Sequence, residues 1–162
     1  MSLEADDRLA TNKRAGLDVE VAIADVHVPQ LQLVPDDVVD YYDAVAASLV
    51  QPSASVPFVG ICLLERGTVV EIKSAQVTYA DGARGRFYVR PAQHEALLED
   101  GGVYLFAVCT SDAGREVLAL KVVPATVVDD VLGEDPWIDG GAGRSDYAQV
   151  AWSRIFDPGE VA

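Results

Sequence analysis

The alternation of apolar and polar residues is clearest in the middle of the chain. The segments TVVEIKSAQVTYA (68–80) and RFYVR (86–90) alternate with the period of two that is typical of half-buried β-strands. VYLFAVC (103–109) is an almost unbroken apolar run, which predicts a central strand covered on both faces. REVLALKVV (115–123) is a further strand, and the alternation in LDVEVAIADVHV (17–28) predicts another near the N-terminus.

Three helices and one hairpin complete the predicted elements. Apolar residues recur at helical spacing over 34–50, where Pro35 suits the first turn. PAQHEALLEDGG (91–102) and PATVVDDVL (124–132) both begin with proline, and glycines follow the first of these helices. VPFVGICLLE (56–65) reaches the strand at 68–80 through Arg66-Gly67, which is a hairpin signal.

This order of elements predicts a single α/β domain over residues 17–162, with helices packed on one mixed sheet. Residues 1–16 are polar and charged, so we expect a flexible N-terminal segment. The glycine-rich stretch 133–146 follows no clear strand and lacks the lysine of a phosphate-binding loop, which makes it a plain loop. The segment 147–158 offers Trp152 and Phe156 for docking on the domain.

The composition is strongly acidic. Asp and Glu number 26 against 12 Lys and Arg, and the formal net charge is −14. Two explanations fit: an acidic surface that serves a partner or mimics nucleic acid, or a protein from the salt-loaded cytoplasm of a halophile. Because the acids are spread along the chain and lysine is scarce, we favour the second, with an origin in a halophilic archaeon or its virus.

The cysteines and the apolar runs indicate a cytoplasmic protein. Cys62 and Cys109 lie in strand-like apolar segments without metal-ligand spacing, so we expect buried free thiols. No stretch is as long as a membrane span and no signal peptide opens the chain, which predicts that the protein has no membrane partner.

Charged residues share one face of the predicted strand at 68–80. Period two places Glu71 and Lys73 on the face opposite to Val70 and Ile72. If the Val/Ile face packs in the core, Glu71 and Lys73 must face solvent, a cleft or a ligand. The tripeptide alone is also compatible with an ordinary solvated strand face.

The next strand carries an arginine strip, which consists of Arg84, Arg86 and Arg90 on the face that also holds Tyr88. Residues 60–94 carry a net charge of +2, whereas the rest of the chain carries −16. A positive island in an acidic chain indicates an anionic ligand, and arginine forks match phosphate. The strip is therefore a candidate nucleic-acid-binding surface, although edge-strand arginines also protect against aggregation.

The order of elements around Glu71 resembles that of the PD-(D/E)xK nuclease superfamily, which includes restriction endonucleases and archaeal Holliday-junction resolvases. The resemblance covers about residues 35–123. It rests on a helix, a hairpin that carries VVEIKSA, a further strand, and AQHEALLEDGGVYLFAVC as the following helix and buried strand. It implies a restriction-endonuclease-like fold, nucleic acid as partner (DNA rather than RNA), and metal-dependent hydrolysis of phosphodiester bonds.

The resemblance also implies roles for single residues. Glu71 would be a ligand of Mg²⁺ or Mn²⁺, Lys73 would position the attacking water, and Gln93 or His94 would face the site from the following helix. Phosphodiester hydrolysis needs a Lewis acid, and Mg²⁺ held by one or two carboxylates supplies it. A lysine beside the metal stabilises hydroxide and the charge of the phosphorane. A homodimer would suit cleavage of both strands of a duplex.

One ligand of the superfamily's pattern is missing from its usual place. The first Asp usually lies on the strand before the Glu, but PFVGICLL contains no carboxylate. Asp43, and after it Asp40, are the candidate replacements, three residues apart on the predicted helix. Both also fit a solvated acidic helix face. Two alternatives to a nuclease stay open: the same fold as a non-catalytic binding module, and a regulatory protein whose acidic surface is its working face.

Overall fold

A mixed β-sheet forms the centre of the molecule. The computed structural model describes Ile23, Val28, residues 30–34, residues 43–47, Val59 and residues 64–161. Within these residues one sheet has the order β1-β2-β3-β5-β6, with β1 Leu31–Leu33, β2 Ala44–Ala46, β3 Val69–Gln76, β5 Val103–Cys109 and β6 Val117–Pro124. Strands β3 and β5 are parallel, and the other neighbouring pairs are antiparallel.

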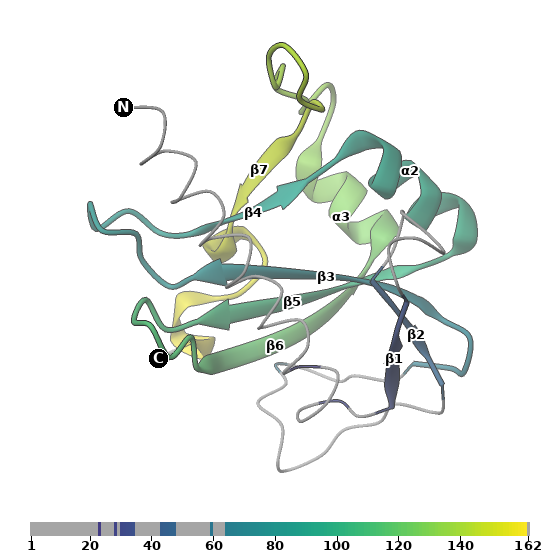
Figure 1. The fold of residues 1–162 in the computed structure, drawn as a ribbon, viewed down its shortest axis with the longest axis horizontal. Helices are drawn as coiled ribbons and strands as arrows, with labels where there is room; N and C mark the ends of the chain where they lie inside the picture. The colour runs from purple at the N-terminus through teal and green to yellow at the C-terminus, as the bar shows by residue number, and fades with distance from the viewer. Residues whose placement is uncertain are drawn as a thin grey trace.

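Two helices pack on this sheet (Figure 1). Helix α2 (Pro91–Asp100) lies in the connection between the parallel strands β3 and β5, and α3 (Ala125–Leu132) follows β6. Proline opens α2, and Gly101 ends it with φ 65° in the left-handed region that glycine adopts without strain. The predicted fold class, a small α/β domain with helices on one mixed sheet, is confirmed.

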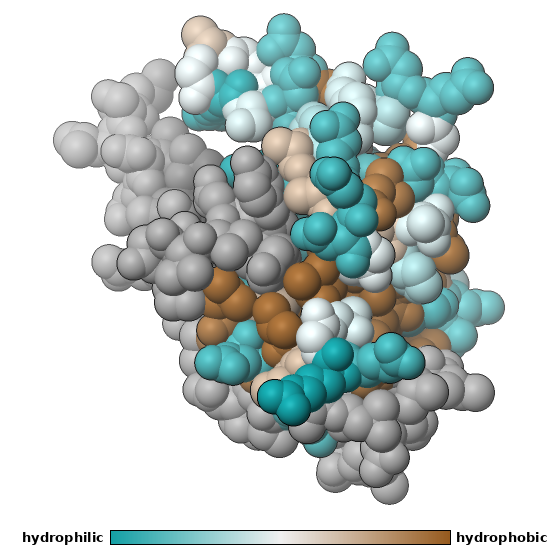
Figure 2. Space-filling view, turned by 90° about the vertical axis from the view of Figure 1, so that its right-hand side faces the viewer, coloured by the Kyte–Doolittle hydropathy of each residue, from teal (hydrophilic) through white to brown (hydrophobic). Residues whose placement is uncertain are grey.

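Apolar clusters cover both faces of the sheet. The first cluster includes Ile23, Val28, Val70, Ile72, Leu105 and Leu120. The second lies on the helical side and includes Phe87, Leu97, Tyr104, Phe106 and Val128. Strand β5 is buried along its whole length between them, as its sequence predicts, and Cys109 is a buried free thiol. From the right-hand side of Figure 1, hydrophilic residues flank a band of hydrophobic ones (Figure 2).

A second, two-stranded sheet stands beside the helices. Strands β4 (Arg86–Val89) and β7 (Ala148–Ala151) pair antiparallel, with Tyr88 opposite Gln149. The short 3₁₀ helices η2 (Trp152–Arg154) and η3 (Pro158–Glu160) follow. Trp152 is buried and its indole N–H donates to the carbonyl oxygen of Val77 at 2.8 Å, which confirms that the C-terminal segment docks on the domain.

The predicted helix over 34–50 is wrong at residues 44–46, which form strand β2. Ala44 and Ala46 are buried and Val45 is half-buried, a period of two, and β2 pairs with β3 through Ala44 opposite Val70. A short apolar run fits either period, and pairing with β3 decides in favour of the strand. Residues 35–42 and 48–50 lie outside the described residues.

Two further local predictions differ from the structure. The amide of Val28 donates to the carbonyl oxygen of Ile23 at 2.6 Å, a bond that an extended strand over 17–28 cannot make. The turn at Arg66-Gly67 forms, with the amide of Thr68 bonded to Glu65. Val59, however, donates to Leu120 of β6, so the predicted pairing of 56–65 with β3 is wrong at this residue. The rest of these two segments, and Cys62, lie outside the described residues.

Candidate active site

Strand β3 places Glu71 and Lys73 on its helical face. Glu71 lies beside Tyr104 of β5 and Lys73 beside Phe106, while Val70 and Ile72 point into the opposite cluster. The alternation predicted from the sequence is therefore confirmed. Glu71 is only 3% exposed, because helix α2 and its neighbours cover this face. A buried carboxylate is costly unless it is paired, so its contacts determine what it can do.

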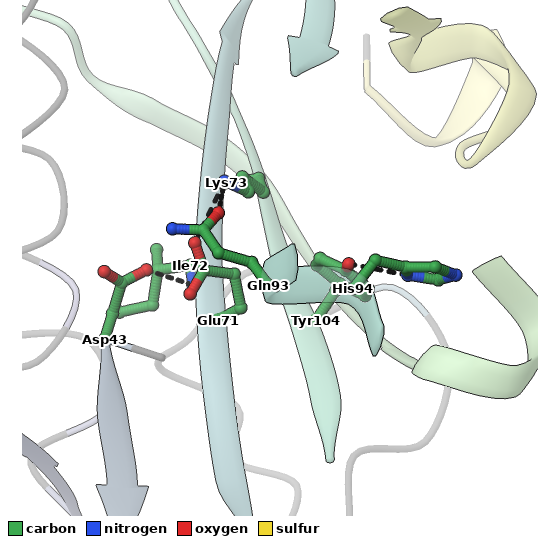
Figure 3. Close-up of polar contacts among 7 residues, drawn as sticks. All are labelled: Asp43, Glu71, Ile72, Lys73, Gln93, His94 and Tyr104. Atoms are coloured by element: carbon green, nitrogen blue, oxygen red, sulfur yellow. Dashed lines mark hydrogen bonds and ion pairs between the residues drawn. The ribbon is translucent and has the colours of Figure 1, made fainter. Parts of the chain in front are cut away.

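Lys73 joins Glu71 to helix α2. Its Nζ lies 2.9 Å from Glu71 Oε1 and donates to Gln93 Oε1 at 3.4 Å, as Figure 3 shows. The lysine side chain keeps 17% of its surface exposed, so the ammonium group lies where the buried acid meets solvent. The structure thus brings together three of the residues that the sequence singles out, two from β3 and one from the first turn of α2.

Asp43 approaches the same group from the residue before β2. Its Oδ2 accepts a hydrogen bond from the backbone amide of Ile72 at 2.7 Å, and its own amide donates to Val70 at 3.0 Å. These two bonds fix Asp43 against β3, next to Glu71 (Figure 3). Asp43 therefore directly precedes a strand and does not lie on a helix face as expected. Asp40 lies outside the described residues.

The environment of Glu71 favours its protonated form. Burial raises the pKa of Glu71 from 4.5 to about 7, Lys73 opposes the shift, and the nearby Asp43 carboxylate adds to it. Glu71 Oε2 is fully buried and has no hydrogen-bond partner among the described residues. A buried oxygen of this kind next to a second carboxylate is a place where a proton or a cation would be stabilised.

His94 belongs to a neighbouring polar group. Its Nδ1 lies 2.8 Å from the hydroxyl of Tyr104, and its Nε2 lies 2.9 Å from Asp129 Oδ1 of α3. The imidazole is 2% exposed and points away from Glu71 and Lys73 (Figure 3). Both ring nitrogens are occupied, so the structure does not bring His94 into contact with the acid and the lysine.

Tyr104 and Asp129 were missed by the sequence analysis. Tyr104 is the β5 neighbour of Glu71 and its ring is buried. Burial, and then the charges of Glu71 and Asp129, raise the pKa of the Tyr104 hydroxyl, which therefore stays protonated. A tyrosine in an otherwise apolar central strand was the available signal, since a buried hydroxyl needs a partner. Asp129 gave no signal in so acidic a chain.

The arginine strip lies on β4 and its flanks, and all three arginines are exposed residues. Arg84 stands over the ring of Trp152 at 5.5 Å, and Arg86 Nη1 donates to Gln149 Oε1 at 2.7 Å. Arg90 is the residue that precedes α2. The predicted shared face is confirmed, because Phe87 and Val89 between them are fully buried.

The donor set at β3 suits a small divalent cation. Asp43 and Glu71 supply carboxylate oxygens, which Mg²⁺ and Mn²⁺ prefer, and Mg²⁺ is commonly held by one or two carboxylates and several waters. The described residues contain no group of three or more His, Cys, Asp or Glu side chains that could hold a metal. The unpartnered Oε2 of Glu71 is compatible with a cation held by the two carboxylates of Glu71 and Asp43.

Comparison with protein families assigns the chain. The model of the PD-(D/E)XK nuclease superfamily domain matches residues 6–157, almost the whole sequence. The chain therefore belongs to the PD-(D/E)XK nuclease superfamily, as the residues around Glu71 indicate. A comparison with curated proteins finds no significant match. Among the described residues, no helix combines the length and the apolar character needed to cross a membrane.

Proposed function

We propose that this protein is a divalent-metal-dependent nuclease that hydrolyses phosphodiester bonds in DNA. The observation that carries the proposal is the arrangement on β3: the buried Glu71 carboxylate, with Oε2 unpartnered among the described residues, lies beside Asp43 and 2.9 Å from Lys73. Membership of the nuclease superfamily supports the same chemistry.

Glu71 and Asp43 would hold Mg²⁺ or Mn²⁺. The bound cation would supply a Lewis acid for the phosphoryl oxygens and lower the pKa of a bound water. The hydrogen bond from the Ile72 amide would hold the Asp43 carboxylate in place for this role. Burial keeps Glu71 in a position of low dielectric, where its attraction for a cation is strong.

Lys73 would orient the attacking water and stabilise the charge that develops on phosphorus. Gln93 accepts a hydrogen bond from Lys73 Nζ, so α2 limits the positions that the ammonium group can take. Gln93 is thus a positioning residue. His94, whose ring nitrogens contact Tyr104 and Asp129, would hold α2, β5 and α3 together behind the site. The exposed arginines 84, 86 and 90 would contact the phosphates of the DNA.

A non-catalytic binding module is the second candidate. The direct Glu71–Lys73 ion pair favours it, because Lys73 partly compensates the buried carboxylate with no cation present. Both candidates share the arginine strip and differ only in whether Glu71 and Asp43 bind a metal.

Nuclease assays in molar KCl with Mg²⁺ or Mn²⁺ distinguish the two candidates. Single-stranded, duplex and four-way-junction DNA would be incubated with the wild type, Glu71→Ala and Lys73→Ala. We expect metal-dependent cleavage that both substitutions abolish, with Glu99→Ala, an exposed acid on α2, as the matched control. Cleavage that survives both substitutions would disprove the proposed site, and no cleavage of any substrate would favour the binding module.

A further inference from the structure

The outer face of the β4–β7 sheet combines aromatic and basic residues. On β4, Arg86 and Tyr88 point outward while Phe87 and Val89 are buried. The register sets Gln149 opposite Tyr88, and Tyr147, two residues earlier, shares the Gln149 face. The rings of Tyr88 and Tyr147 are 5.7 Å apart between centroids. Tyr88 is 48% exposed, so much of this large ring is accessible to a ligand.

A cleft opens beside these rings. Its volume is about 680 Å³, within the range of small-molecule and nucleotide sites. It is lined by Tyr88, Arg90, Gly140, Gly143, Arg144, Ser145, Tyr147 and Gln149. None of these described lining residues is acidic, although the chain as a whole carries a net charge of −14. Two arginines and no acid make the cleft a local site for an anion.

The glycine-rich loop 139–146 forms one wall of the cleft and is held in a fixed shape. Ile138 and Tyr147 exchange backbone hydrogen bonds of 2.7 and 3.0 Å at its base. The Asp139 side chain accepts from the Gly141 amide at 2.8 Å. A Cβ on Gly140 would collide with the backbone of Ser145, so the loop closes tightly only with glycine there. These contacts set the backbone of the loop at Arg144 and Tyr147.

Gln149 fixes the aromatic side of the cleft. Its Nε2 donates to the Tyr88 hydroxyl at 3.1 Å, while its Oε1 accepts from Arg86 at 2.7 Å. The Tyr88 hydroxyl is thus held by Gln149 while the residue stays exposed. Arg90 is exposed and also lines the cleft.

We propose that this cleft binds an unpaired segment of nucleic acid, with a base stacked on Tyr88 or Tyr147 and the adjoining phosphates on Arg90 and Arg144. This inference rests on the proposed function and names its substrate class as DNA with a single-stranded stretch. Interleaved aromatic and basic residues are how proteins bind single strands, since every base has a face that can stack. A base inside a duplex offers no such face. Duplex DNA would engage the arginines alone.

Equilibrium binding tests this directly. A fluorescently labelled single-stranded DNA oligonucleotide of mixed sequence, the same sequence as duplex, and the same sequence as single-stranded RNA would be titrated with the full chain in EDTA at several KCl concentrations. Fluorescence anisotropy measures each Kd. We expect the single strands to bind more tightly than the duplex, and Tyr88→Leu to weaken single-strand binding about 5- to 150-fold, the range for loss of one stacked base.

Matched variants separate stacking from charge and from misfolding. Tyr88→Phe keeps the ring and should retain single-strand affinity, and Arg66→Ser, an exposed turn arginine, should leave binding unchanged. If Tyr88→Leu fails to fold, Tyr147→Leu and Arg144→Ser test the cleft from the loop side, and thermal melts check each variant. Arg144→Ser should also reduce the salt dependence of binding.

Three results would overturn the inference. The first is that Tyr88→Leu and Tyr147→Leu bind single strands as tightly as the wild type does. The second is that these substitutions weaken duplex and single-strand binding equally, and the third is that the wild type binds neither form. An RNA strand whose affinity falls by the same factor in Tyr88→Leu supports the same site. EDTA prevents metal-dependent hydrolysis during the binding titration. If the protein binds single strands as expected in EDTA but cleaves no DNA in the nuclease assay with Mg²⁺ or Mn²⁺, only the proposed nuclease activity is rejected. Glu71-dependent cleavage with unaltered binding by the tyrosine variants rejects only the cleft.

Discussion

Burial of Glu71 disfavours the charged form of its carboxyl group. Its pKa rises to about 7 in the folded protein, although Lys73 lies 2.9 Å away. The folded state therefore holds the proton more tightly than the unfolded state does. This contribution to stability is complete below about pH 4.5 and is lost as the pH rises through about 7.

A pH series of unfolding experiments checks this sign. We predict that the free energy of unfolding falls by up to about 3 kcal/mol from pH 4.5 to above pH 7 because of Glu71. Glu71→Gln imitates the protonated form, so it should flatten this decline and stabilise the protein at alkaline pH. Glu99→Gln, an exposed acid, is the control. Equal slopes in the wild type and Glu71→Gln would show that the burial of Glu71 has no such effect.

Asp43 combines a structural role with the proposed metal ligation, and two substitutions separate them. Asp43→Asn retains an oxygen that can accept from the Ile72 amide, so stability should change little while cleavage is lost. Asp43→Ala leaves that amide without its partner and should cost about 1–3 kcal/mol. Urea denaturation measures the first quantity and the nuclease assay the second. An active Asp43→Asn would remove Asp43 from the proposed site.

At the scale of the elements, the parallel pairing of β3 with β5 sets the site. The connection leaves β3, passes through β4 and α2, and returns to β5, so that Gln93 on α2 comes to lie over Lys73. After β3 the chain turns back, with Thr78 bridged to Arg84, and at Gly85 it passes so close to the end of β3 that an added Cβ would collide with the backbone carbonyl of Gln76. The three atoms nearest to that Cβ all belong to the backbone of Gln76, so the collision cannot be relieved by moving a side chain.

Gly85→Ala should therefore destabilise the protein by about 3 kcal/mol or more, since overpacking against backbone cannot relax. Gly159→Ala is the matched control, because its Cβ would meet only the Asp157 side chain at 3.6 Å, an ordinary contact. Chemical denaturation of the two variants measures the difference. Equal stability of both variants would mean that the backbone of Gln76 leaves more room at Gly85 than described.

The elements that the sequence predicts well are those with a local signal. Alternation identified β3 and β4, the unbroken apolar run identified β5, and proline and glycine bounded α2. Strand β2 was predicted as helix because Ala44–Ala46 is too short for its own pattern to decide. Its strand conformation depends on pairing with β3, which lies more than 20 residues further along the chain. The β4–β7 sheet was missed for the same reason, since its strands are separated by α2, β5, β6 and α3.

In the candidate site, too, the local sequence identifies some residues, whereas other contacts depend on tertiary packing. Glu71 and Lys73 were identifiable from neighbouring positions on one strand. The contacts of Asp43 with Ile72 and of Gln93 with Lys73 depend on tertiary packing, and the superfamily's element order was the only guide to them. The hydrogen bond between His94 of α2 and Asp129 of α3 joins residues 35 positions apart, so no local pattern in the sequence indicated it.

At the scale of the whole molecule, the net charge of −14 sets the conditions under which the protein is stable and can meet DNA. Self-repulsion of so many acids is screened over about 10 Å at 0.1 M salt and over about 3 Å at 1 M. We therefore predict that the melting temperature rises as KCl is increased to molar concentration, as expected for a protein adapted to high salt. Differential scanning calorimetry measures it. A melting temperature that is independent of KCl would contradict a stability limited by charge repulsion.

The most direct test of the central claim is Mn²⁺ binding, because it requires no knowledge of the substrate. Electron paramagnetic resonance would follow free Mn²⁺ during titration of the wild type, Glu71→Gln, Asp43→Asn and the surface control Glu99→Gln, in molar KCl to suppress binding to the acidic surface. We predict one site per chain that Glu71→Gln and Asp43→Asn each weaken about tenfold or more, with Glu99→Gln unchanged. Equal Mn²⁺ binding by all four proteins, or none by the wild type, would contradict a metal site at Glu71 and Asp43.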